Sequence, residues 1–296
     1  MSGAPAVSEP ERPSFGRRLQ QAIAEKGQLC VGIDPHPGML TSWGLSDDAA
    51  GLREFGSRVI AACAGRVAVV KPQVAFFEAY GPAGMQVLAE LTAEARAAGL
   101  LIIADAKRGD IGSTMAAYAQ AWLNPQSEFA ADALTVSPFL GFGSLQPAVE
   151  TAQRFGAGLF VLALTSNPEG QQVQLAGAGG QTVAGDIVAQ TAAANQAHDP
   201  DAPLGSIGLV IGATTAHLAQ SHAIDLEFSR PPLLAPGYGA QGASAEQLRR
   251  SFGAAWDQVL VNSSRGILQR GPHVAELTAA IEESVADLGL NTGNNP

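Results

Sequence analysis

The chain has 296 residues, of which 46% are hydrophobic and 15% are charged. This apolar fraction supplies a sizeable core and excludes an intrinsically disordered chain. A net charge of −10 argues against nucleic acid or an anionic membrane as a partner, because the field around the molecule repels polyanions. Any anionic ligand must therefore be held by a local cationic pocket.

The N-terminal residues 1–13 are small, Pro-rich and acidic, and we expect a disordered leader there rather than a secretory signal. No apolar run reaches the ~20 residues that span a bilayer. The two cysteines, Cys30 and Cys63, lie in apolar runs, as buried free thiols do in a reducing compartment. Together these features predict a cytoplasmic protein.

Short runs rich in Val, Ile and Leu alternate with longer stretches of helical periodicity, which predicts a parallel sheet covered by helices. Strands are expected at residues 29–34, 67–72, 100–107, 133–138, 159–165, 207–213, 232–236 and 258–263. Helices are expected, among other places, at residues 46–64, 82–98, 244–256 and 273–288. Ser244 and Gln247 have the spacing of a capping box at the start of the third of these helices.

Eight βα units in a chain of this length predict an α/β fold, a closed (β/α)8 TIM barrel, with an open doubly wound sheet as the alternative. No linker divides the chain, so we expect one domain over residues 14–288 and a disordered tail at 289–296. An irregular stretch rich in Gly and Gln, residues 166–185, follows the fifth strand. Such loops are lids or binding loops, with a disordered insertion as the alternative.

Three successive strands end in charge. Asp34 follows the first strand, Lys71 lies at the end of the second, and Asp105 and Lys107 end the third. In a barrel these ends open on one face, where active sites of this architecture lie. Because side chains alternate along a strand, Asp105 and Lys107 are predicted to share a side, with Ala106 pointing away. Only three of the 17 basic residues are Lys and two stand here, which indicates a role that needs a proton Arg cannot release.

The segment 105–114, DAKRGDIGST, resembles the D-x-K-x-x-D signature of the orotidine 5′-phosphate decarboxylase family, in the form carried by its longer bacterial members. The resemblance covers residues 15–268, through segments in the expected order: VGIDPHP, VVKPQ, TVSPFLG, TSNPEG, PGYGAQGA and NSSRGI. D-x-K-x-x-D alone is shared with sugar-phosphate decarboxylases and related barrels, whereas the ordered set is more specific. Ser137 stands where an Asn-Pro is more often expected, so no role is assigned to it.

The resemblance implies a cofactor-independent conversion of orotidine 5′-monophosphate to UMP and CO2, the last step of de novo pyrimidine synthesis. Loss of CO2 from C6 leaves a carbanion in the plane of the ring, which the π system cannot delocalise. The barrier must therefore fall through preorganised charge and remote binding. By resemblance, Lys107 protonates C6 and Asp105 lies near the departing carboxylate. Lys71 and Asp34 are implied to orient Lys107 and the ribose hydroxyls.

The family also implies a homodimer with shared sites, because the last Asp of the motif reaches the neighbouring subunit. Asp110, Ile111 and Thr114 are then expected to enter the partner's site.

The phosphate end of the site is expected after the seventh and eighth strands. Residues 237–242, GYGAQG, match G-x-G-x-x-G, but a dinucleotide fingerprint opens the first βα unit of its fold, and this run follows the seventh strand. We interpret it as a phosphate loop with Arg265 as the charged clamp. By resemblance, Gln241 bridges the phosphate and pyrimidine O2, and Ser166 bonds the amide edge of the pyrimidine.

Three alternatives stay open at this point. A Schiff-base aldolase needs a neutral lysine, which the carboxylates beside Lys107 disfavour but which Lys71 still allows. A Mg²⁺-dependent sugar-phosphate decarboxylase or aldolase needs a further acidic ligand, and Glu78 is the nearest candidate. A non-catalytic nucleotide-binding barrel is the third. We predict no metal and no cofactor.

Overall fold

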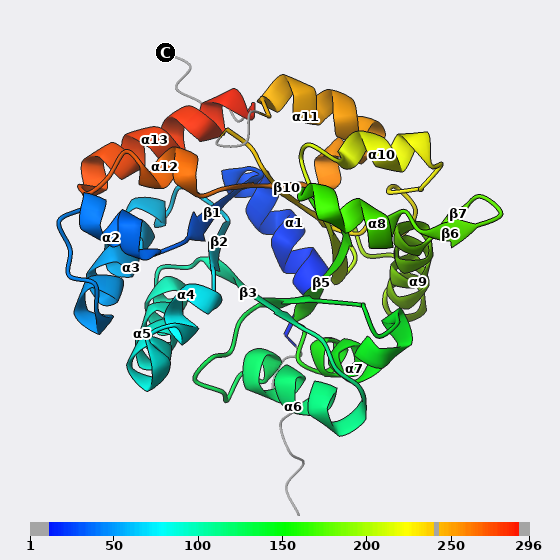
Figure 1. The fold of residues 1–296 in the computed structure, drawn as a ribbon, viewed down its shortest axis with the longest axis horizontal. Helices are drawn as coiled ribbons and strands as arrows, with labels where there is room; N and C mark the ends of the chain where they lie inside the picture. The colour runs from blue at the N-terminus through cyan, green and yellow to red at the C-terminus, as the bar shows by residue number, and fades with distance from the viewer. Residues whose placement is uncertain (1–11, 240–242, 290–296) are drawn as a thin grey trace, which may run out of the picture.

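Residues 12–239 and 243–289 are described in the computed structural model of the chain. In them, parallel strands form a closed barrel, with each strand paired to the next and the last paired to the first (Figure 1). The barrel strands are β1 (Leu29–Ile33), β2 (Val69–Pro72), β3 (Leu101–Arg108), β4 (Ala133–Val136), β5 (Gly158–Leu164), β8 (Ile207–Ile211), β9 (Leu233–Pro236) and β10 (Val259–Ser263). The predicted (β/α)8 barrel is confirmed, and the pairing of Leu29 with Val261 excludes the open sheet.

Helices cover the barrel: α1 lies across one end, and most of the others surround its outer side (Figure 1). They are α1 (Phe15–Lys26), α2 (Pro37–Ser42), α3 (Ala49–Cys63), α4 (Ala75–Glu78), α5 (Gly81–Ala97), α6 (Gly112–Leu123), α7 (Gln146–Arg154), α8 (Gln171–Gln174), α9 (Val183–His198), α10 (Ala216–Ser221), α11 (Ala245–Phe252), α12 (Arg265–Leu268) and α13 (Val274–Asp287). The capping box predicted at Ser244 and Gln247 is present, but α11 ends at Phe252. The chain continues as the 3-10 helix η3 (Gly253–Gln258), because Gly253 adopts a φ of 52° that breaks the α-helix.

The stretch 166–185 is less irregular than its composition predicts. It contains the 3-10 helix η2 (Pro168–Gly170), helix α8 and a short antiparallel pair of strands, β6 (Gly177–Ala178) and β7 (Gln181–Thr182). Helix α9 begins inside it, where the Thr182 hydroxyl accepts a hydrogen bond from the Gly185 backbone N–H. Local turn and capping chemistry therefore orders a segment that has no hydrophobic periodicity.

Helix α1 is not among the helices named above from the sequence patterns. It crosses the centre of the ring of strands in Figure 1. Its Phe15 and Leu19 are fully buried and belong to a core cluster with Ile103, Phe160 and other residues of the barrel strands. The rings of Phe15 and Phe160 meet edge to face, with centroids 6.0 Å apart. Thus α1 closes the end of the barrel at which the strands begin.

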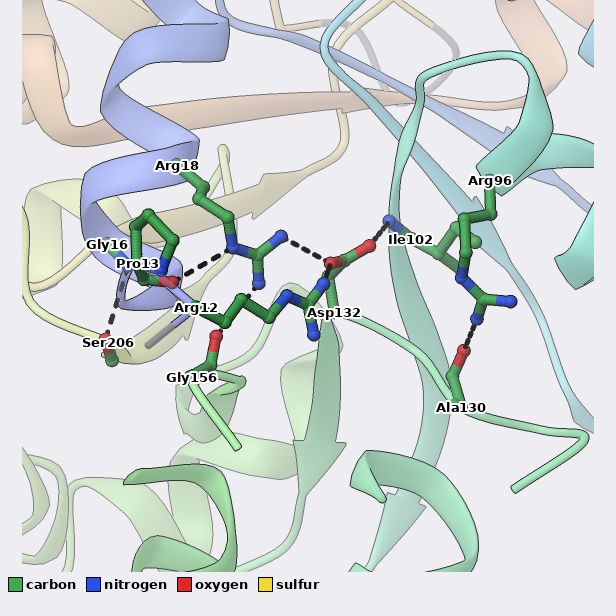
Figure 2. Close-up of polar contacts among 10 residues, drawn as sticks. All are labelled: Arg12, Pro13, Gly16, Arg18, Arg96, Ile102, Ala130, Asp132, Gly156 and Ser206. Carbon is green, nitrogen blue, oxygen red and sulfur yellow. Dashed lines mark hydrogen bonds and ion pairs between the residues drawn. The ribbon is translucent and has the colours of Figure 1, made fainter. Parts of the chain in front are cut away.

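A buried carboxylate ties this end of the barrel to the chain before α1 (Figure 2). Asp132 lies just before β4, and its Oδ1 accepts hydrogen bonds from Arg12 Nη2 at 2.6 Å and Arg18 Nη1 at 2.5 Å. Its Oδ2 accepts from the backbone N–H of Ile102 in β3 at 2.9 Å. Burial lowers the pKa of Arg18, although the Asp132 carboxylate opposes that effect. Asp132 therefore joins two strands and α1 through one side chain.

Among the described residues, no helix combines the length and the apolar character that crossing a bilayer requires.

Replacing Asp132 by Asn should lower the free energy of unfolding by roughly 3 kcal/mol, because the largely buried Arg18 guanidinium, 17% exposed, loses its counter-charge. Urea unfolding measures this loss. The matched control is Asp199→Asn, which removes the exposed pair of Arg17 and Asp199 and should cost less than about 1 kcal/mol. Equal losses in the two variants would contradict the anchoring role of Asp132.

Candidate active site

One cavity of about 720 Å³ opens at the end of the barrel where the strands finish. Its lining includes the charged residues that the sequence places at three successive strand ends: Asp34, Lys71, Asp105 and Lys107. The prediction that these side chains converge on one face is therefore confirmed by the geometry. A cavity of this size holds a ligand as large as a nucleotide.

The Asp105 carboxylate is the centre of this cluster. Its Oδ2 accepts a hydrogen bond from Lys71 Nζ at 2.7 Å, and its Oδ1 accepts one from Lys107 Nζ at 2.5 Å. A third donor, the Thr135 hydroxyl, reaches Oδ1 at 3.0 Å. Lys71 and Asp105 are buried, whereas the Lys107 side chain is 45% exposed. Of the two ammonium groups, that of Lys107 is therefore the one accessible to a bound molecule.

The charges of this cluster stabilise one another. Burial opposes the charge on Lys71, but the Asp105 and Asp34 carboxylates outweigh burial and raise the pKa of Lys71 above its ordinary value. Burial likewise opposes the charge on Asp105, but the two ammonium groups lower the pKa of Asp105 to about 2. At neutral pH the cluster holds a carboxylate and a buried ammonium. Lys71 is therefore a poor candidate for an imine-forming lysine, which needs its neutral form.

The backbone at Lys107 departs from a regular strand. Its φ is +49°, a left-handed conformation that few non-glycine residues adopt. The pairing of β3 with β4 is irregular here, because β3 advances by four residues, from Ala104 to Arg108, while β4 advances by only two. Simple alternation correctly predicts that Asp105 and Lys107 share the cavity side. However, Lys107 reaches the cavity side through a β-bulge and not through a regular pleated strand. Alternation along the strand alone does not account for its contact with Asp105.

The rest of the cavity wall includes residues that follow β5, β9 and β10. Ser166 follows β5, Gly237 follows β9, and Arg265 begins α12 directly after β10. Gly237 and Gly239 have φ values of 118° and 70°, which other residues rarely adopt, so the predicted phosphate loop depends on glycine at both positions. Gln241 lies outside the described residues.

Two side-chain oxygens in the cavity wall have no hydrogen-bond partner within the described part of the chain. Asp34 Oδ1 and Gln73 Oε1 are both buried, and both residues line the cavity. A buried acceptor without a partner is costly, so such atoms indicate where a ligand donates hydrogen bonds. Gln73 and Thr135 are cavity residues that sequence reasoning missed. Only their positions in the sequence could have indicated them, because Gln73 follows the strand that ends near Lys71 and Thr135 is two residues before Ser137.

Asp110, Ile111 and Thr114 are not part of this cavity's lining. They lie between the end of β3 and the first turn of α6, where Asp110 Oδ1 accepts a hydrogen bond from the Ile111 backbone N–H at 2.8 Å. The Ile111 side chain is 62% exposed.

Glu78, the acidic residue that a metal-dependent reaction would need, is engaged elsewhere. It forms an ion pair with Arg108 and does not line the cavity. His36 does line the cavity, but its Nδ1 accepts a hydrogen bond from the Met39 backbone N–H at the start of α2. Within residues 12–239 and 243–289, no three His, Cys, Asp or Glu side chains are grouped to hold a metal ion.

Comparison with known proteins gives one consistent family. Residues 27–280 match the model of the orotidine 5′-phosphate decarboxylase / HUMPS family. Orotidine 5′-phosphate decarboxylases of Streptomyces coelicolor and Salinispora arenicola are 54% and 53% identical to the chain, over 93% of it and 96% of each relative.

Solved structures agree with this result. A crystal structure from Streptomyces avermitilis, described as an orotidine 5′-phosphate decarboxylase, superimposes with a TM-score of 0.89 and 51% identity. That comparison covers 96% of this chain and 98% of the other. A structure of Leishmania donovani OMP decarboxylase superimposes with a TM-score of 0.74 and 28% identity, over 94% of this chain and 100% of the other. The chain belongs to the orotidine 5′-phosphate decarboxylase / HUMPS family.

Proposed function

We propose that this chain converts orotidine 5′-monophosphate to UMP and CO2 without a cofactor, as a step of pyrimidine biosynthesis. The observation that carries the proposal is the Asp105 carboxylate, held between the Lys71 and Lys107 ammonium groups at the mouth of the barrel. The names of the relatives that align over nearly the whole chain support the same reaction.

The reaction breaks the bond between C6 and the carboxylate carbon, and CO2 leaves while the electron pair stays on C6. The substrate carboxylate would lie beside Asp105, so that repulsion between two carboxylates is relieved as CO2 departs. The Lys107 ammonium, exposed to the cavity, stabilises the developing carbanion and then gives its proton to C6. Lys71 stays charged and keeps Asp105 ionised, since each raises the stability of the other's charge.

The rest of the nucleotide would extend across the cavity. Asp34, whose Oδ1 has no partner in the described structure, would accept from the ribose hydroxyls. Ser166 would bond the amide edge of the pyrimidine, and Gln241 would bridge the phosphate and O2. Arg265 would clamp the phosphate together with backbone amides of the loop at Gly237. A local cation is needed here because the protein as a whole repels anions.

A homodimer with shared sites is part of the proposal. Ile111, Phe139 and Leu140 are 62%, 77% and 55% exposed, which is unusual for large apolar side chains. They lie on neighbouring loops, because the Ser137 N–H donates to the Arg108 carbonyl at 2.8 Å. Contact between two copies of the chain would cover these three exposed apolar side chains. The same contact would bring Asp110, Ile111 and Thr114 toward the partner's cavity.

We place the reaction in the cytoplasm. Cys30 and Cys63 are free and buried, and burial raises the pKa of both thiols, which keeps them protonated and inert.

Adding orotidine 5′-monophosphate to the purified protein should cause the loss of pyrimidine absorbance that accompanies decarboxylation, and EDTA should not change the rate. The measurement is continuous ultraviolet absorbance, with UMP identified by chromatography. Metal-dependent turnover of a ketose phosphate would favour the Mg²⁺ alternative instead. UMP binding without any turnover would favour a non-catalytic barrel.

Lys107→Arg should be nearly as inactive as Lys107→Ala, with kcat lowered by roughly 10²-fold to 10⁴-fold, because a guanidinium keeps the charge but is a very poor acid. Steady-state kinetics measure the loss, and UMP binding checks that the site is still formed. Substantial activity in the Arg variant would rule out Lys107 as the proton donor.

Mixing two inactive proteins tests the shared site. Lys107→Ala and Asp110→Ala subunits should recover part of the wild-type activity after exchange, because a heterodimer contains one site with both native residues. Differently tagged subunits allow the heterodimer to be purified and assayed. An inactive, verified heterodimer would contradict the contribution of Asp110 in trans.

A further inference from the structure

The Thr135 hydroxyl lies between the Asp105 carboxylate and the Lys107 backbone. Thr135 lies in β4 and is 1% exposed. Its Oγ1 donates a hydrogen bond to Asp105 Oδ1 at 3.0 Å and accepts one from the Lys107 backbone N–H at 2.9 Å. The Thr135 hydroxyl oxygen therefore binds both the Asp105 carboxylate and the Lys107 backbone.

The acceptor half of this contact explains how Lys107 keeps its conformation. A left-handed conformation is strained for a non-glycine residue and persists only where its surroundings impose it. The β3 bulge takes the Lys107 N–H out of the regular ladder, and the Thr135 hydroxyl receives it instead of a strand carbonyl. Without this acceptor the partly buried Lys107 N–H would lose its partner.

The next residue of the bulge is fixed to the same strand and to the outer layer. The Arg108 carbonyl accepts from the Ser137 N–H at 2.8 Å. The Arg108 guanidinium pairs with Glu78 and lies 5.6 Å and 5.7 Å from the ring centroids of Tyr118 and Trp122. Arg108 therefore anchors the bulge from outside the barrel. Thr135 anchors it from inside and is also in contact with the charged cluster.

The donor half of the contact sets the direction of the carboxylate. Asp105 Oδ1 receives both the Thr135 hydroxyl and Lys107 Nζ, and Oδ2 receives Lys71 Nζ. A hydroxyl is the only common side-chain group of this size that donates and accepts from a single atom. Valine has the same shape as threonine but can do neither, and serine can do both.

From these contacts we propose that Thr135 is a positioning residue for the Asp105 and Lys107 pair. This inference rests on the proposed decarboxylation. Thr135 does not act on the substrate. It aims the carboxylate and fixes the turn from which the Lys107 ammonium reaches the substrate, so it governs the transition state more than substrate binding.

The test compares Thr135→Val, Thr135→Ser and the matched control Thr92→Val. Thr92 is also buried, in α5, where its Oγ1 donates only to the Leu88 carbonyl of the same helix. Thr135→Val should lower kcat by roughly tenfold to hundredfold with KM changed less than about threefold, because the lost bonds involve a charged group at the reacting centre. Thr135→Ser should recover most of that kcat, and Thr92→Val should keep wild-type kcat whatever its melting temperature.

Several outcomes would overturn the assignment: wild-type kcat in Thr135→Val, no recovery in Thr135→Ser, or an equal kcat loss in Thr92→Val. Wild-type protein that binds but does not convert the substrate would instead contradict the proposed function. In that case crystal structures of the wild-type and Thr135→Val proteins decide the positioning role. It stands if the Lys107 turn or the Asp105 carboxylate moves in the variant, and it fails if both stay in place.

Discussion

The arrangement in the cavity depends on one carboxylate that two ammonium groups share. Buried charges are tolerated only when each has close partners, and removing one member leaves the others uncompensated. Asp105 accepts one hydrogen bond from each ammonium group, and because the Lys107 side chain is 45% exposed, its remaining N–H groups face the cavity where a ligand binds. Two further groups lie beside this cluster: a hydroxyl on the same carboxylate and a second carboxylate at Asp34, both in the wall of the cavity.

The closed barrel makes this cluster possible because it brings strand ends from distant parts of the chain to one rim. Its two ends differ in chemistry. The end where strands begin is sealed by α1, with Phe15 and Leu19 inside and Asp132 held by two arginines. The end where strands finish stays open and carries the charged cluster. Stability and function are therefore concentrated at opposite ends, as the architecture favours.

Sequence patterns located the barrel strands to within a few residues, because strands buried on both faces are continuous apolar runs bounded by turns. They did not reveal α1, or the helix and hairpin within 166–185, whose formation depends on packing and capping. They also missed the bulge at Lys107. Only Gly, Asn or Asp marks a left-handed position in a sequence, and a lysine there is imposed by its neighbours. Gln73 and Thr135 were missed because common polar residues carry no motif.

The sequence by itself determined the order of βα units, the charged strand ends and the resemblance to one family, since these depend on residue type and spacing along the chain. Tertiary structure decided which atoms meet. That Lys71 and Lys107 share Asp105, and that Thr135 joins Asp105 to the Lys107 backbone, follows from three strands brought side by side. Distances between strands depend on barrel closure and local bulges, which are properties of the packed molecule and of no single segment.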